Sequence, residues 1–150
     1  MKKAAVLLLL LCMLPVLLGC GTKNAIRDED STMSKELTLM VDDTVIPVIW
    51  ENNPSVAELT EQAARKAMQI EMSMYGGWEQ VGSLGYSIAR NDVPLTAGNG
   101  DIMLYSGNQI VLFYGENSWA YTKLGHIDLP AEEVSALLGG GAVSITLAVQ

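Results

Sequence analysis

Residues 98–127 read GNGDIMLYSGNQIVLFYGENSWAYTKLGHI, and this stretch decides the fold class. Residues 101–105 and 109–114 are rich in β-branched and aromatic residues, and the turn-forming triplet Ser106-Gly107-Asn108 separates them. A third run of this kind, residues 119–124, follows a second polar turn. Short strands joined by tight turns are therefore predicted over the whole stretch.

The region before this stretch begins with a predicted hairpin. Apolar residues alternate with other residues over 37–41, as expected for a strand with one buried face. Asp42-Asp43 is a turn signal, and residues 44–50 form a second β-rich run. Pro47 cannot donate to a ladder, so its strand is expected at a sheet edge or with the proline facing outward.

A helix is predicted after the hairpin. Asn53-Pro54-Ser55 opens it, and Ser55 and Glu58 have the spacing of a capping box. The helix is expected to end before Tyr75-Gly76-Gly77. Its apolar stripe, at steps of three and four, comprises Val56, Leu59, Ala63, Ala67 and Ile70.

The C-terminal part predicts a short helix and a last strand. The helix fits residues 130–138, with Asp128 as its cap and three glycines as its stop. The strand fits residues 143–149, where apolar residues alternate with small and polar ones. Two helices and seven or eight short strands predict a mainly β fold, a β-barrel or closed sandwich with capping helices.

The N-terminus resembles a bacterial lipoprotein signal. Two lysines precede the apolar run of residues 4–14, which suits a signal peptide and is too short to span a bilayer. Leu17-Leu18-Gly19-Cys20 follows, and the resemblance implies cleavage before Cys20 and lipidation of its thiol. We expect a signal peptide over 1–19, a flexible tether over 20–35 and a domain over 36–150. The alternative is an ordinary signal peptide, or an uncleaved anchor, with an incidental cysteine.

Composition excludes several classes of function. The chain has 9 basic and 17 acidic residues, a formal charge of −8, and no basic cluster for nucleic acid. One histidine and two cysteines exclude a Cys/His zinc site and a disulfide scaffold. No metal or cofactor is predicted, and the partners expected are the membrane, through the lipid, and a peptide or small anionic ligand. The location expected is the extracytoplasmic face of a bacterial cell membrane or envelope.

His126 is the only imidazole, and so the only candidate base with an unperturbed pKa near neutrality. A hydrolase would need it together with a nearby acid such as Asp128, but the sequence has no Gly-x-Ser-x-Gly elbow. The glycine-rich residues 98–101 precede a strand and not a helix, so they are interpreted as a turn and not as a phosphate loop.

Five ordered motifs over residues 36–149 resemble the bacterial cyclophilin-like domain family. They are Tyr75-Gly76-Gly77-Trp78-Glu79, Asn91-Asp92-Val93-Pro94, residues 98–105 (GNGDIMLY), residues 107–115 (GNQIVLFYG) and residues 117–127 (NSWAYTKLGHI). The resemblance implies a closed barrel of about eight strands with a helix at each end. It does not imply prolyl isomerase activity, because the catalytic arginine motif of active cyclophilins is not found.

We expect a non-catalytic, membrane-tethered binding module, with prolyl isomerase activity on exported proteins as the alternative and a hydrolase third. Exposed aromatics beside amides often line binding surfaces, although Trp119 and Tyr121 would equally suit the interior of a barrel. Arg90 and Lys123 are the only cations after residue 67. The candidate ligand-binding residues are Arg90, Gln109, Asn117, Trp119, Tyr121 and Lys123.

Overall fold

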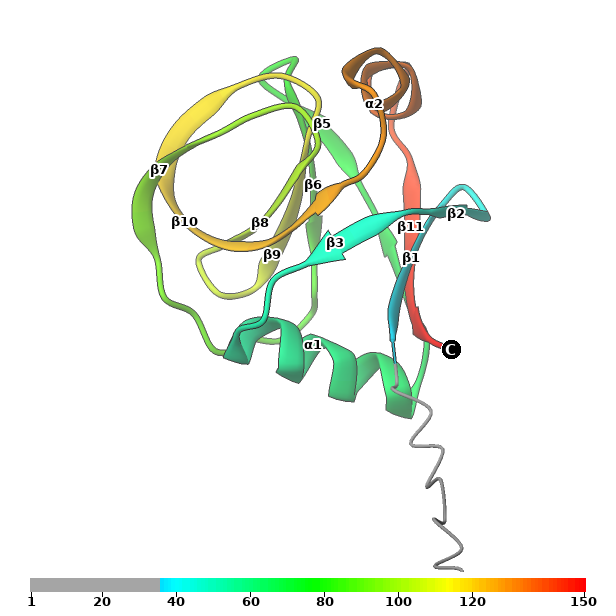
Figure 1. Cartoon of the computed structure of the whole chain (residues 1–150), viewed down its shortest axis with the longest axis vertical. Helices are drawn as coiled ribbons and strands as arrows, with labels where there is room; N and C mark the ends of the chain where they lie inside the picture. The colour runs from blue at the N-terminus through cyan, green and yellow to red at the C-terminus, as the bar shows by residue number, and fades with distance from the viewer. Residues whose placement is uncertain (1–35) are drawn as a thin grey trace, which may run out of the picture. The chain divides into compact units, whose positions relative to one another are not determined.

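The computed structural model describes residues 36–150, which form eleven strands and two helices in two antiparallel sheets (Figure 1). The predicted mainly β class is confirmed. The expected signal peptide, the lipidated Cys20 and the tether lie outside the described residues.

The first sheet has four strands and brings the two ends of the domain together. Its order is β2-β1-β11-β4, and Leu39 of β1 pairs with Leu147 of β11. Both side chains are fully buried, which explains the alternation seen in both segments. The bounds are β1 Leu37–Val41, β2 Thr44–Ile46, β4 Met68–Glu71 and β11 Ser144–Val149.

The second sheet has seven strands. Its order is β3-β10-β8-β9-β6-β5, and β7 pairs with the first half of β10. The main hydrophobic core includes side chains of both sheets, such as Leu39, Ile145, Leu104 and Leu112. The bounds are β3 Val48–Trp50, β5 Ser73–Tyr75, β6 Glu79–Ser83, β7 Val93–Ala97, β8 Asp101–Tyr105, β9 Gln109–Phe113 and β10 Asn117–Ile127.

The closed barrel is not confirmed, because the pairing of neither sheet returns to its first strand. The chain crosses between the sheets at Pro47, where the single predicted strand 44–50 divides into β2 and β3. Proline has no N–H, so it interrupts the ladder at this crossing. A second crossing lies at Met72, between β4 and β5. The two sheets therefore meet through buried side chains and not through one continuous ladder.

Helix α1 spans Pro54–Arg65, and its cap differs from the prediction. Asn53 is the N-cap, and its Oδ1 accepts a hydrogen bond of 3.0 Å from the Val56 amide. Ser55 donates instead to the Ala89 carbonyl at 2.6 Å, and Glu58 accepts from the Ala89 amide at 2.9 Å. The two residues of the expected capping box therefore hold the segment that precedes β7.

The apolar stripe predicted for this helix extends beyond the end of the helix. Helix α1 ends at Arg65, and Ile70 belongs to β4. Lys66 has φ −161°, an extended conformation that stops the helix. Ile70 is buried by its place opposite Ile145 in the first sheet, and Ala67 is exposed.

Helix α2 spans Ala131–Leu138 and follows Pro130, with no side-chain cap, so Asp128 does not cap it. Gln80 of β6 is fully buried, and its Nε2 donates to the carbonyls of Leu138 and Gly141 at 2.6 Å each. This amide fixes the end of α2 to the second sheet. In Figure 1, α1 and α2 lie at opposite ends of the sheets. Within residues 36–150, neither helix has the length and apolar character needed to cross a membrane.

Candidate functional site

The second sheet carries a smaller core on the face that does not join the main one. Val81, Val111 and Met103 are paired across β6, β9 and β8, so their side chains share this face. The buried cluster consists of Ala97, Met103, Val111, Phe113 and Tyr121, with Val81, Leu95 and Tyr105 packed against it.

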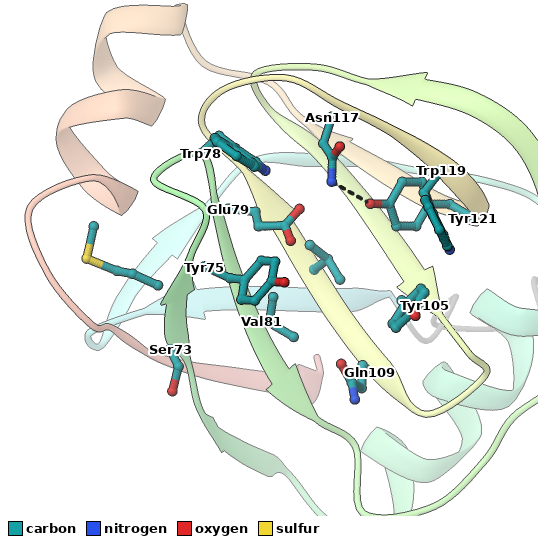
Figure 2. Close-up of a pocket in the computed structure, with 12 residues that line it drawn as sticks. Ser73, Tyr75, Trp78, Glu79, Val81, Tyr105, Gln109, Asn117, Trp119 and Tyr121 are labelled. Atoms are coloured by element: carbon teal, nitrogen blue, oxygen red, sulfur yellow. Dashed lines mark hydrogen bonds between the residues drawn. The ribbon is translucent and has the colours of Figure 1, made fainter.

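A cavity of about 680 Å³ lies beside this second core (Figure 2). The β5–β6 hairpin supplies one part of its wall, the first half of β10 supplies another, and β8 and β9 supply the remaining residues. The twelve lining residues are Ser73, Met74, Tyr75, Trp78, Glu79, Val81, Tyr105, Gln109, Val111, Asn117, Trp119 and Tyr121.

Five of the lining residues are aromatic, and they differ in how firmly they are held. Tyr121 is buried and makes edge-on contacts with Tyr105 and Phe113, with ring centroids 6.1 and 5.6 Å apart. Its hydroxyl accepts a hydrogen bond of 3.3 Å from the Asn117 amide, drawn in Figure 2. Trp119 is 61% exposed and leaves a large ring surface open to a ligand.

Trp78 is placed at the cavity by two glycines. A Cβ atom on Gly76 would lie 2.3 Å from the Trp78 ring, and one on Gly115 would lie 2.5 Å from its Cβ. Gly76 also has φ +60°, a conformation that side chains disfavour. The amides of Tyr114 and Gly115 donate to the Trp78 carbonyl at 2.9 Å each. The absence of side chains at 76 and 115 is therefore what lets the indole take this position.

Glu79 is the only charged residue in the lining, and it is almost wholly buried, with 5% of its surface exposed. Its Oε2 atom has no hydrogen-bond partner within residues 36–150. Burial raises the pKa of the Glu79 carboxyl above its ordinary value, and the neighbouring Asn117 amide offsets only part of that rise. Burial, together with the Glu79 charge, also raises the pKa of Tyr121.

Four of the six predicted ligand-binding residues line the cavity, namely Gln109, Asn117, Trp119 and Tyr121. The two cations do not. Arg90 lies 3.4 Å from an Asp92 carboxylate oxygen, measured from its Nη1. Lys123 lies 3.2 Å from an Asp101 carboxylate oxygen, measured from its Nζ.

His126 also lies outside the lining, and its partner is Asp101 and not Asp128. Its Nδ1 is 3.1 Å from Asp101 Oδ1, while the Gly98 amide donates to Asp101 Oδ2 at 2.9 Å. Burial acts to raise the pKa of Asp101, but the Gly98 amide, His126 and Lys123 outweigh it and lower that pKa. This network fixes the turn before β8, and none of its residues lines the cavity.

Sequence reasoning missed Glu79 and the aromatic residues Tyr75, Trp78 and Tyr105. Three of these four stand in the motif Tyr75-Gly76-Gly77-Trp78-Glu79, which was used only for the resemblance. The available signal was Glu79 itself, an acidic residue directly after a tryptophan and at the start of a β run. Within residues 36–150, no group of three or more His, Cys, Asp or Glu side chains is placed to hold a metal ion.

Comparison with protein-family models gives a match over most of the described domain. The sequence model of a family described as the cyclophilin-like family matches residues 39–148, which include the whole cavity lining. A search of curated proteins found no match.

Proposed function

Because the chain belongs to the cyclophilin-like family, we propose that it is a membrane-tethered binding module that holds a peptide or other small ligand without changing it chemically. The observation that carries this proposal is the aromatic cavity of about 680 Å³ beside the second core.

The cavity has the dimensions and the chemistry of a ligand site. Its volume falls within the range of about 300–1,000 Å³ found for small-ligand pockets. The rings provide apolar area, and the amides of Gln109 and Asn117 provide directional donors and acceptors. The exposed rings of Tyr75 and Trp119 are parts of the wall with a large surface to bury on binding.

Prolyl isomerisation is the alternative, and it requires a group that stabilises a twisted amide against a barrier of about 18–20 kcal/mol. Arg90 and Lys123 were the candidates for that group, but each faces a carboxylate and neither lines the cavity. This arrangement favours binding over isomerisation. A tetrapeptide assay with Ala-Pro substrates decides between them, since acceleration at micromolar protein would support the isomerase instead.

The tether is proposed from the sequence. Cys20 directly follows the lipoprotein-like signal expected over residues 1–19, and two or three acyl chains anchor a protein stably. Residues 36–150 carry 14 acidic and 4 basic residues, a net charge of −10, so anionic headgroups repel the domain. We therefore assign the attachment to the lipid and the location to the extracytoplasmic face of the cell membrane or envelope.

Tryptophan fluorescence tests the cavity directly, because Trp78 and Trp119 line it. The full chain in non-ionic detergent is titrated with pooled, capped tetrapeptides of mixed composition. We expect Trp119→Ala to weaken binding at least tenfold, since large rings dominate binding sites. Val45→Ala is the matched control, because Val45 is 57% exposed and lies outside the cavity. Equal affinities for the wild type and Trp119→Ala would refute this site.

A further inference from the structure

The Glu79 carboxyl is the one group of the cavity whose chemistry the proposed function leaves unused. Its side chain lies among the lining residues between Trp78, Tyr75 and Asn117, as Figure 2 shows. A buried acceptor without a partner destabilises the fold, and more so when it is charged. Such a group persists in a ligand site when the ligand supplies the missing partner.

No side chain of the described domain neutralises Glu79. Its basic residues are Arg65, Arg90, Lys123 and Lys66. The first three lie 3.9, 3.4 and 3.2 Å from the carboxylates of Glu61, Asp92 and Asp101. Lys66 is the C-cap of α1, and none of the four lines the cavity. An ionised Glu79 therefore has no counter-charge within the described domain, and a cationic ligand could supply one.

The surroundings of Glu79 suit one kind of partner. Tyr75, Trp78, Tyr105, Trp119 and Tyr121 line the same cavity. Aromatic faces attract cations within about 6 Å, and they do so more strongly once water is excluded. They offer nothing comparable to an anion, which Glu79 and the net charge of −10 also repel.

We propose that the cavity selects ligands bearing an organic cation, an ammonium or a guanidinium group, which pairs with the Glu79 carboxylate among the aromatic rings. This rests on the proposed function, because it names the ligand of the same cavity. It also names a cationic ligand, whereas a peptide or a small anionic ligand was expected from the sequence.

A neutral Glu79 that donates a hydrogen bond to a ligand carbonyl is the competing arrangement, and it has the opposite pH dependence. Pairing with a cation requires the ionised carboxyl, so affinity would rise with pH through the raised pKa and then level off. Donation requires the protonated carboxyl, so affinity would fall over the same range. Glu79→Gln also separates them, because glutamine keeps a donor but loses the charge.

The test uses the full chain in non-ionic detergent and peptides of the form acetyl-Ala-X-Ala-Ala-amide. X is arginine, its neutral isostere citrulline, or glutamate, and agmatine supplies a free guanidinium. We expect the arginine peptide to bind at least tenfold more tightly than the citrulline peptide. Glu79→Gln should abolish that difference and leave the citrulline affinity within about twofold.

Glu116→Gln is the matched control, because Glu116 is exposed and lies outside the lining, one residue before Asn117. It should leave the arginine preference within about twofold, which separates pairing in the cavity from long-range attraction. Agmatine binding that depends on Glu79 supports recognition of the cation alone, and binding only of the arginine peptide supports recognition within a peptide.

Two results overturn the inference in distinguishable ways. If the peptides bind in a Trp119-dependent manner but without preference for arginine, or with preference for glutamate, the cation assignment fails and the proposed function stands. If neither agmatine nor any peptide binds the wild type, both fail together.

Discussion

At the scale of single residues, Glu79 links the site to the stability of the domain. Burial raises the pKa of its carboxyl in the folded protein above the ordinary value of 4.5. The folded state therefore holds this proton more tightly than the unfolded state. The contribution of Glu79 to stability is complete below pH 4.5 and is lost as pH rises through the folded pKa. Asp101 has the opposite effect, because its pKa is lowered in the folded state. Its contribution to stability is complete above pH 3.8 and is lost only as pH falls through the lower folded pKa.

We predict that Glu79→Gln removes the loss of stability above pH 4.5. Glutamine carries no charge to desolvate, so at pH 8 the variant should exceed the wild type by on the order of 1 kcal/mol. Urea unfolding at pH 4.5 and pH 8 measures the difference, with Glu116→Gln as the control for loss of a surface charge. A wild type whose stability rises over this interval, relative to the variant, would contradict the prediction.

At the scale of elements, Asn53 joins α1 to the second sheet. Its Oδ1 caps the helix, and its Nδ2 donates to the Lys123 carbonyl of β10 at 2.8 Å. We predict that Asn53→Ala lowers the free energy of unfolding by about 1–2 kcal/mol, because the cap and this cross-link are lost together. Asn52→Ala, at an exposed neighbour, should change it by less than about 0.5 kcal/mol. Equal effects of the two substitutions in denaturant titrations would show that the cap is unimportant.

The turn between β5 and β6 (residues 76–78) places Trp78 in the cavity wall. A substitution at Gly115, which lies against Trp78, tests this placement. We predict that Gly115→Ala displaces Trp78, because the new Cβ would lie 2.5 Å from the Trp78 Cβ and 3.1 Å from its Cα. Binding of the probe peptides should weaken and the Trp78 emission should shift. Gly140→Ala is the control, since its Cβ would meet its nearest neighbour at an ordinary 3.8 Å. Unchanged emission in Gly115→Ala would show that Trp78 is not displaced and would contradict this prediction.

Local sequence pattern was sufficient to predict some helices and strands and insufficient for others. The alternation in β1 and β11 predicted both strands, because each buries one face against the main core. The stripe of α1 was extended to Ile70, because steps of three and four continue by coincidence across the short strand β4. Only the pairing of β4 with β11 decides that segment, and pairing between residues 68 and 147 is not a local property.

At the scale of the whole molecule, three of the four predicted residues that line the cavity lie on one strand, and Gln109 of β9 is the fourth. Asn117, Trp119 and Tyr121 alternate on β10, so a period of two placed them together. Glu79, Val81 and Tyr105 come from other strands, whose register the sequence does not show. Arg90 and Lys123 were included for their charge, but the fold pairs each with a carboxylate.

The proposed attachment to the membrane depends on the net charge of the domain and on Cys20. With a net charge of −10 over residues 36–150, the domain has no net electrostatic attraction to anionic lipid, so the proposed attachment rests on a thioether at Cys20. We predict that Cys20→Ser abolishes incorporation of labelled palmitate and leaves the signal uncleaved. Cys12→Ser is the matched control, because Cys12 lies within the expected signal, and it should keep both label and cleavage. Palmitate incorporation and signal cleavage are both measured on one gel of cells grown with labelled palmitate. Label retained in Cys20→Ser would show that the lipid is on another residue. Because the uncleaved signal also binds membranes weakly, label and cleavage decide the question and fractionation alone does not.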